Sequence, residues 1–204
     1  MKLEDYKLLF SAVGLIVVLL IATPALGEVI RFPGGEQFSE LDLLNSNRMA
    51  ENYPYNIVVG QNYSVIVGVG NDLGSSTYYV LYVKFGNQTD QLPDSTSATS
   101  SPLAPLYEYR FFVQDGGTWE SPLTFSVTDA YVLGNQSMIK TLTVNDLAFG
   151  VDKPAAWDVN STAFSYQLFL ELWIYNVQNN SIQFNSCFVG LHLNLTQTTI
   201  QGAA

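Results

Sequence analysis

The chain contains one cysteine, Cys187, and one histidine, His192, among its 204 residues. A single cysteine excludes an intrachain disulfide, a thiolate metal cluster and a CxxC redox pair. Such a cysteine among aromatic and aliphatic neighbours is most often a small buried hydrophobe, although an intermolecular disulfide or a reactive thiol stays open. The histidine would have to serve any Ser-His-Asp triad or histidine-based metal site, and no nucleophile with a supporting motif accompanies it.

Charged residues are also scarce, since they make up 13% of the chain where roughly 25% is usual. Eight Lys and Arg stand against 18 Asp and Glu, which argues against phosphate binding and therefore against a nucleic-acid partner. The acidic residues do not show the D-x-D-x-D-G spacing of a calcium loop, so a calcium ion held between loops is only an alternative. We therefore predict a protein that is not an enzyme, with no catalytic residues, no cofactor and no metal ligands.

A long uncharged segment near the start is the strongest signal for a cellular compartment. Residues 8–27 are uncharged and mostly apolar, and this length of 20 residues is about what a helix needs to cross a hydrocarbon core of about 30 Å. We predict a transmembrane signal anchor over 8–27, a short cytoplasmic N-terminus over 1–7 and an extracellular domain over 28–204. A cleaved signal peptide is the alternative, because the small residues at 25–27 resemble a peptidase site.

The charges beside this segment predict its orientation. Lys2 and Lys7 precede it, whereas Arg31 is the only cation close behind it. The positive-inside rule then leaves the N-terminus in the cytoplasm. We expect a single-pass protein of the cell membrane that contacts lipid through 8–27 and exposes its C-terminal domain outside the cell.

Acceptor patterns for N-glycosylation, Asn-x-Ser/Thr without a central proline, all follow the apolar segment. The strand patterns described below put two of these asparagines on outward strand faces and two in turns. We predict a glycoprotein whose candidate sites are Asn62, Asn87, Asn135, Asn160, Asn179 and Asn194.

Alternation of apolar and polar residues predicts strands after the apolar segment. Apolar residues at Phe38, Leu41 and Leu43 indicate a first short strand. Residues 63–69 and 79–85 each carry one apolar face. The connection between them is rich in residues that form turns, so we predict that these two strands pair as a hairpin.

Five later segments show similar alternation or runs of aromatic and branched residues, and we predict strands at 107–113, 118–128, 137–144, 163–177 and 181–195. We expect the first two to form a second hairpin and the last two to pair through a short turn. Segment 90–105 is rich in Ser, Thr and Pro, which predicts a long exposed loop unable to order itself. Pro154 is assigned to another loop. About eight to ten strands predict an all-β fold, namely an antiparallel immunoglobulin-like β-sandwich behind a single N-terminal transmembrane helix.

Four aromatic residues lie on strand faces opposite the predicted core. Tyr78 and Tyr82 alternate with the apolar residues of 79–85, and Trp173 and Tyr175 alternate with those of 163–177. Either a second sheet or a loop covers these side chains, or they form an exposed aromatic patch that binds protein or glycan. These four residues are the candidate interaction residues.

Several motifs in these segments resemble a known family. They are Tyr53-Pro54, the pattern V-G-x-x-x-x-V-I-V-G-V-x-N over 59–71, W-E-x-P over 119–122, and Leu172-Trp173. The chain resembles the archaeal membrane-protein family of domain of unknown function 1616 over roughly residues 36–130 and 163–177. The resemblance implies an archaeal envelope protein and supplies no catalytic residues. Members often carry several membrane helices before this domain, whereas one is predicted here.

We expect a membrane-anchored extracellular structural or interaction subunit of the cell envelope or of a larger membrane assembly. Its expected partners are membrane lipid and other envelope or membrane proteins. A carbohydrate- or ligand-binding module that uses exposed aromatic residues, with a glycan as ligand, is one alternative. A non-catalytic accessory subunit of a membrane enzyme complex is another.

Overall fold

The computed structural model describes residues 6–7, 10–18 and 36–196, and the chain divides into two units, 1–37 and 38–204. In the first unit, residues 10–18 are helical. No helix among the described residues has both the length and the apolar character needed to cross a membrane. Much of the predicted anchor, namely 8–9 and 19–27, lies outside the described residues.

The second unit is built from strands, as the sequence predicts. Alternation of inward and outward side chains continues through most of them, which is why they form strands rather than helices. Their bounds are β1 Phe38–Asn45, β2 Asn56–Ile57, β3 Tyr63–Asp72, β4 Thr77–Asn87, β5 Tyr107–Val113, β6 Gly117–Leu133, β7 Gln136–Val144, β8 Leu147–Asp158, β9 Ala163–Asn176 and β10 Ser181–Leu195.

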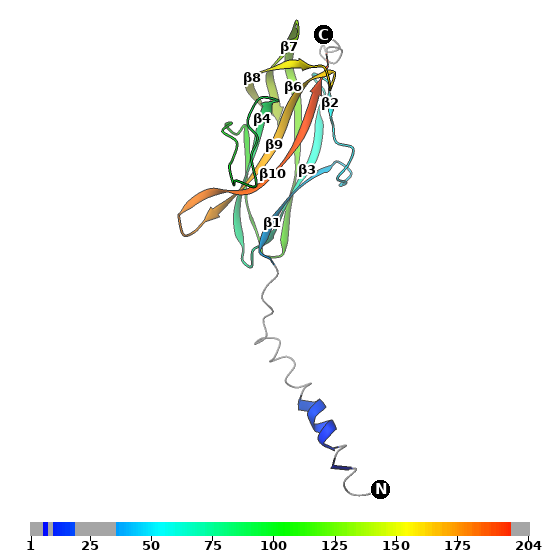
Figure 1. Cartoon of the computed structure of the whole chain (residues 1–204), viewed down its shortest axis with the longest axis vertical. Helices are drawn as coiled ribbons and strands as arrows, with labels where there is room; N and C mark the ends of the chain where they lie inside the picture. Colours follow the sequence, from blue (N-terminus) through cyan, green and yellow to red (C-terminus); the bar gives the residue numbers. More distant parts are fainter. Residues whose placement is uncertain (1–5, 8–9, 19–35, 197–204) are drawn as a thin grey trace. The chain divides into compact units, whose positions relative to one another are not determined.

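The strands form two groups that are joined at one edge (Figure 1). In the first group the hydrogen-bonded order is β1-β3-β6-β7-β8, and in the second it is β2-β10-β9-β4-β5. Trp157 and Asp158 of β8 pair with Phe164 and Ala163 of β9, and this short ladder connects the groups. All neighbouring strands are antiparallel except β2 and β10, which are parallel.

One hydrophobic core lies between the two groups. The inward residues of β3 and β6, such as Val67 and Leu123, belong to the same buried cluster as Leu81 of β4 and Leu170 of β9. All four side chains are fully buried. The sheet therefore curls so that its two halves enclose a single core, and each half keeps an outer face.

Both predicted hairpins near the start of the domain are wrong. β3 pairs with β1 and β6, whereas β4 pairs with β5 and β9, so the chain passes from the first strand group to the second between β3 and β4. It returns to the first group between β5 and β6. Two strands with one apolar face each satisfy the burial requirement equally well side by side or facing each other, so alternation could not distinguish these arrangements.

Segment 90–105 is a largely exposed loop, as predicted, but it is ordered, because it packs on the outer face of β4 and β9. Pro93 and Ser101 are buried, and a bridge between Asp94 and Thr99 closes a turn within the segment. The main chain of Ser101 bonds to two buried charged side chains, which are described below. Polar bonds rather than apolar burial hold this segment, and composition alone does not reveal such bonds.

Two smaller predictions need correction. Pro154 lies inside β8 rather than in a loop, opposite Met138 of β7. Proline is tolerated there because β8 has no hydrogen-bonded neighbour on its other side at this position. Phe38 does not share the inward face of Leu41 and Leu43, because its position in β1 has the opposite parity, and 45% of its surface is exposed.

The domain has two distinct ends. The near end is where β1 begins, and it contains the turns 73–76, 114–116 and 177–180. The pairs Phe38 with Asp72 and Asn71 with Gly117 bring the first strands together there. The far end contains the turns 134–135 and 159–162 and the end of β10 (Figure 1).

Candidate functional site

The outer face of the second strand group displays a continuous set of aromatic side chains. The ladder pairs Tyr78 with Phe112 and Trp173 with Phe184, so rings from four strands lie in adjoining rows. We call this surface the aromatic face, and its residues are Tyr78, Tyr82, Phe112, Trp173 and Phe184. All of them point away from the core, and none is fully buried.

The rings contact one another edge to face or at a tilt. The ring centroids of Tyr82 and Trp173 are 5.4 Å apart at 74°, and those of Trp173 and Phe184 are 5.9 Å apart at 54°. Tyr78 and Phe112 lie 4.9 Å apart at 50°. Such pairs are mutually attractive beyond their buried area. The surface therefore carries two ordered groups of rings, one of Tyr82, Trp173 and Phe184 and one of Tyr78 and Phe112.

A buried carboxylate holds one of these rings in place. Oε2 of Glu171 accepts a 3.0 Å hydrogen bond from Nε1 of Trp173 and lies 2.8 Å from Nζ of Lys84. Its Oε1 accepts a 2.8 Å bond from the main-chain N–H of Ser101. Nζ of Lys84 also donates to the Ser101 carbonyl oxygen at 2.8 Å. Glu171 thus connects the aromatic face, the ion pair and segment 90–105.

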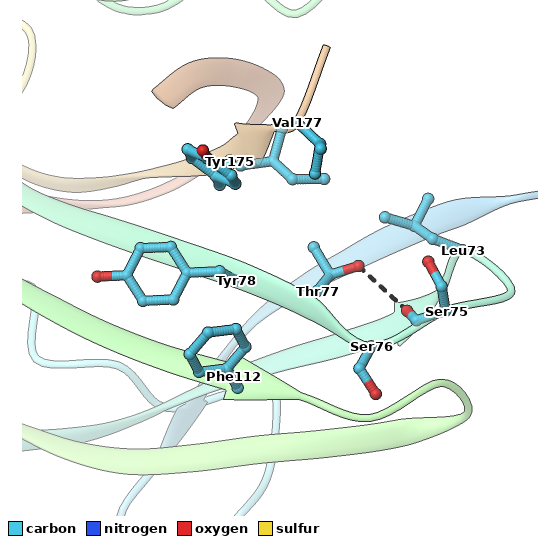
Figure 2. Close-up of a pocket in the computed structure, with 9 residues that line it drawn as sticks. Leu73, Ser75, Ser76, Thr77, Tyr78, Phe112, Tyr175 and Val177 are labelled. Carbon is cyan, nitrogen blue, oxygen red and sulfur yellow. Dashed lines mark hydrogen bonds between the residues drawn. The ribbon is translucent and has the colours of Figure 1, made fainter. Parts of the chain in front are cut away.

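An apolar pocket of about 640 Å³ adjoins the aromatic face at the near end. Figure 2 shows Tyr78 and Phe112 on neighbouring strands along one side, with Tyr175 and Val177 across from them. Leu73 and the hydroxyl-bearing residues 75–77 complete the lining. The hydroxyl of Thr77 bonds to the Ser75 carbonyl oxygen and is thereby satisfied within the rim (Figure 2). The pocket can take an apolar group but offers no charged side chain to bind a polar one.

The structure puts the four predicted interaction residues on the predicted outward faces. Tyr78, Tyr82 and Trp173 are half-buried, and Tyr175 is exposed. Tyr82 and Trp173 come together, whereas Tyr175 lies at the pocket and donates a 2.6 Å hydrogen bond to Oδ1 of Asn180. Neither of the two coverings considered for these residues, a second sheet or a loop, encloses them completely.

Sequence reasoning missed three parts of this site. Phe112 could have been found, because it shares the outward parity of Glu108 and Arg110 in β5. Phe184 also has the outward parity, since Cys187 and Val189 face the core, but its pairing with Trp173 could not be found because it depends on the bulge between Phe184 and Cys187. The ion pair of Lys84 and Glu171 was also missed, because in the sequence it is visible only as two charged residues that lie inside separate β-prone segments.

The remaining candidates for chemistry are dispersed. His192 lies exposed on β10. Cys187 is half-buried against the core, and desolvation raises the pKa of its thiol. Among the residues that the structure describes, no group of three or more His, Cys, Asp or Glu side chains is arranged to hold a metal ion.

The candidate glycosylation sites are unevenly distributed. Four of them lie at the far end, where β4 and β10 end and in the turns 134–135 and 159–162. Asn62 lies about midway along the domain, because the next residue, Tyr63, pairs with Phe125 in the middle of β6. Only Asn179 lies at the near end, in the turn between β9 and β10. Four sites are exposed, whereas Asn87 and Asn194 are half-buried.

We expect Asn87 to be the sequon least often occupied when the folded protein is exposed to an N-glycosylation system. Its Nδ2, the atom that would carry the glycan, donates a 2.7 Å hydrogen bond to the Pro154 carbonyl oxygen, while its Oδ1 accepts bonds from Thr89 and Asp90. Glycopeptide mass spectrometry of protein from a glycosylating host measures this. Occupancy of Asn87 equal to that of the exposed Asn62 and Asn135 would contradict the prediction.

The fold and the aromatic face together define an all-β domain that carries aromatic side chains on the outer face of one strand group. The chain belongs to the family described as domain of unknown function (DUF1616), whose model matches residues 33–142, more than half of the chain. This confirms the family that the sequence motifs indicate. The match ends before Leu172-Trp173, and it contains Tyr78, Tyr82 and Phe112 but neither Trp173 nor Phe184.

Similarity to other known proteins does not indicate a function for this chain. No curated protein matches the chain. A β-glucosidase from Listeria innocua is similar over 78% of this chain, with 10% identity and a TM-score of 0.39, and the chain spans only 16% of that enzyme's length. A chain of the human complex between zinc 2-glycoprotein and prolactin inducible protein is similar over 80% of this chain and 98% of its own, with 7% identity and a TM-score of 0.38. We draw no functional argument from these similarities.

Proposed function

We propose that this protein is a membrane-anchored interaction subunit that works on the outer side of the cell membrane. In this proposal, residues 8–27 are the transmembrane anchor, and the domain from Phe38 onward is an immunoglobulin-like sandwich that binds another protein of the cell envelope. Two strand groups with crossings between β3 and β4 and between β5 and β6 support the sandwich assignment. The sequons that follow the anchor support the outward orientation.

The observation that carries this proposal is the exposed aromatic face. Tyr82, Trp173 and Phe184 are held in one cluster, and Glu171 orients the indole. Aromatic residues that are ordered before binding lose little conformational entropy, which is why they dominate the energetics of protein interfaces. A surface held by a buried ion pair and an ordered segment is suited to recognition. The domain supplies binding, and any reaction would take place in a partner.

Glycan binding is the second candidate. Trp173 is half-buried, so part of its ring is available for a sugar. However, its neighbours Tyr82 and Phe184 are inclined to it by 74° and 54°, and such rings do not form a flat platform. This geometry favours the convex side chains of a protein partner over the flat face of a sugar.

Site-specific photo-crosslinking of the full chain in its native membrane tests the protein-binding role. A crosslinker in place of Tyr82 is expected to give a discrete protein adduct. One in place of Tyr131, which is 45% exposed on β6 in the other strand group, is expected to give none. With the captured partner, Tyr82→Ala should weaken binding about 30-fold, as for a buried aromatic anchor.

Tyr131→Ala is the matched control and should leave the affinity unchanged. Equal adducts at both positions, or none at Tyr82, would argue against the aromatic face as the interface. An affinity for glycans that Tyr82→Ala abolishes, without any protein adduct, would favour the second candidate instead.

A further inference from the structure

The near end of the domain combines an open pocket with unusually exposed apolar side chains. Val177 has 80% of its surface exposed, and Phe112 has 74% exposed. Both line the pocket, together with Tyr175, which is 37% exposed. Together they form an apolar surface, which we call the apolar end, beside the aromatic face. Contiguous apolar surface of this kind marks a contact with a partner or a membrane.

The charges at the near end limit which kind of partner could bind there. The turns 73–76, 114–116 and 177–180 contain no Lys or Arg. Asp115 lies among them, and its carboxylate accepts the Gly74 N–H at 2.7 Å. The nearest cation along β5 is Arg110, which pairs with Glu108 at 2.7 Å. A polyanionic partner is therefore disfavoured, and the surface offers hydrophobic contact without electrostatic attraction.

Chain connectivity limits the distance between the near end and the proposed anchor. Only ten residues separate Gly27, the last residue of the proposed anchor, from Phe38, where β1 begins. A fully extended chain covers at most about 3.6 Å per residue, so Phe38 lies within about 40 Å of the membrane surface. Because β1 begins at the near end, this connection is long enough for the apolar end to reach the membrane surface.

Most of the sequons lie at the opposite end of the domain from the apolar end. Four of the six lie at the far end, where a glycan would project away from the membrane, and Asn62 lies about midway along the domain. The remaining site, Asn179, lies two residues from Val177. A glycan is bulky and strongly solvated, so occupancy of Asn179 and burial of Val177 in lipid exclude each other. The inference requires that Asn179 is unmodified.

We propose that the apolar end docks on the outer leaflet of the bilayer in which this chain is anchored. Val177 and Phe112 enter the boundary between headgroups and acyl chains, with Tyr175 beside them at the polar boundary, as aromatic residues do at membrane surfaces. The aromatic residues Tyr82, Trp173 and Phe184 stay available for a protein partner. This inference rests on the proposed function, because it requires residues 8–27 to anchor the chain.

Fluorescence quenching by lipid tests the docking. The full chain carries Cys187→Ala and one new cysteine, either Val177→Cys or Val159→Cys, labelled with an environment-sensitive dye and reconstituted into phosphatidylcholine vesicles. Val159 is the matched control, since it is a turn valine with 78% exposure at the far end. Spin-labelled lipids are expected to quench the dye at 177 at least about threefold more strongly than at 159. Added salt should leave this difference unchanged.

Three outcomes would overturn the inference. If the chain does not float with vesicles, the anchor is wrong, and both the proposed function and the docking fail. If the chain floats but lipid quenches both dyes equally, only the docking fails. If the dye at 177 is shielded from an aqueous quencher yet not reached by spin-labelled lipid, a protein or a second copy of the chain covers this end instead.

Discussion

Replacing Glu171 with alanine is expected to destabilise the domain by about 3 to 5 kcal/mol, because it leaves the ammonium group of Lys84 buried without a counter-charge. Both side chains are almost fully shielded from solvent, with 4% exposure for Lys84 and none for Glu171. The same change removes the acceptor of the Ser101 N–H and of the Trp173 indole. Urea denaturation followed by circular dichroism measures the loss of unfolding free energy.

Two control variants separate the cost of an unpaired charge from the value of the pair. Lys140→Ala removes a similar ion pair with Asp152 that is 2.8 Å long but exposed, and it should cost at most about 1 kcal/mol. The double variant Lys84→Met with Glu171→Leu should recover the part of the loss that comes from the unpaired charge, but not the part that comes from the lost bonds to Ser101 and Trp173. A Glu171→Ala variant as stable as Lys140→Ala would contradict the burial of this network.

The same substitution should also loosen segment 90–105 and the aromatic face. The main chain of Ser101 exchanges hydrogen bonds with both members of the ion pair, and Trp173 is bonded to the same carboxylate. We therefore expect faster amide hydrogen exchange in this segment and a changed Trp173 emission before global unfolding. The ion pair links the stability of the domain to the order of the surface that we propose binds a partner.

Raising the pH from 10 to 12 is expected to remove about 2 kcal/mol of folding free energy through Tyr166 alone. Burial raises the pKa of Tyr166 from 10.0 to about 12. Its ring is fully buried, and its hydroxyl lies 2.7 Å from Oγ of Ser137. The folded state therefore keeps a proton that the unfolded chain has already lost. This stability is complete below pH 10 and is lost as the pH rises through the folded pKa.

The control for this prediction is Tyr166→Phe, which removes the titrating group and keeps the ring that stacks on Phe85. Its unfolding free energy should fall much less steeply between pH 10 and 12 than that of the unmodified chain. Some dependence should stay, because burial also raises the pKa values of Tyr79 and Tyr109. Identical slopes for the two proteins would show that Tyr166 does not govern the alkaline transition.

Much of the site could be predicted from the sequence because side chains alternate along a strand. The outward positions of Tyr78, Tyr82, Trp173 and Tyr175 follow from that alternation, and the structure agrees. Which of them touch could not be predicted, because contact depends on the register between strands that are far apart in the chain. Tyr82 meets Trp173 only because β4 and β9 are neighbours in one group.

The sequence by itself determined the family, the all-β class and the side of each strand that faces the core, because these depend on composition, local motifs and a repeat of two residues. The tertiary structure alone decided that β3 and β4 lie on opposite sides of the core, because a strand with one apolar face buries it equally well in either arrangement. It also decided that segment 90–105 is ordered. That order comes from hydrogen bonds to Lys84 and Glu171, whose partnership across 87 residues leaves no local pattern in the sequence.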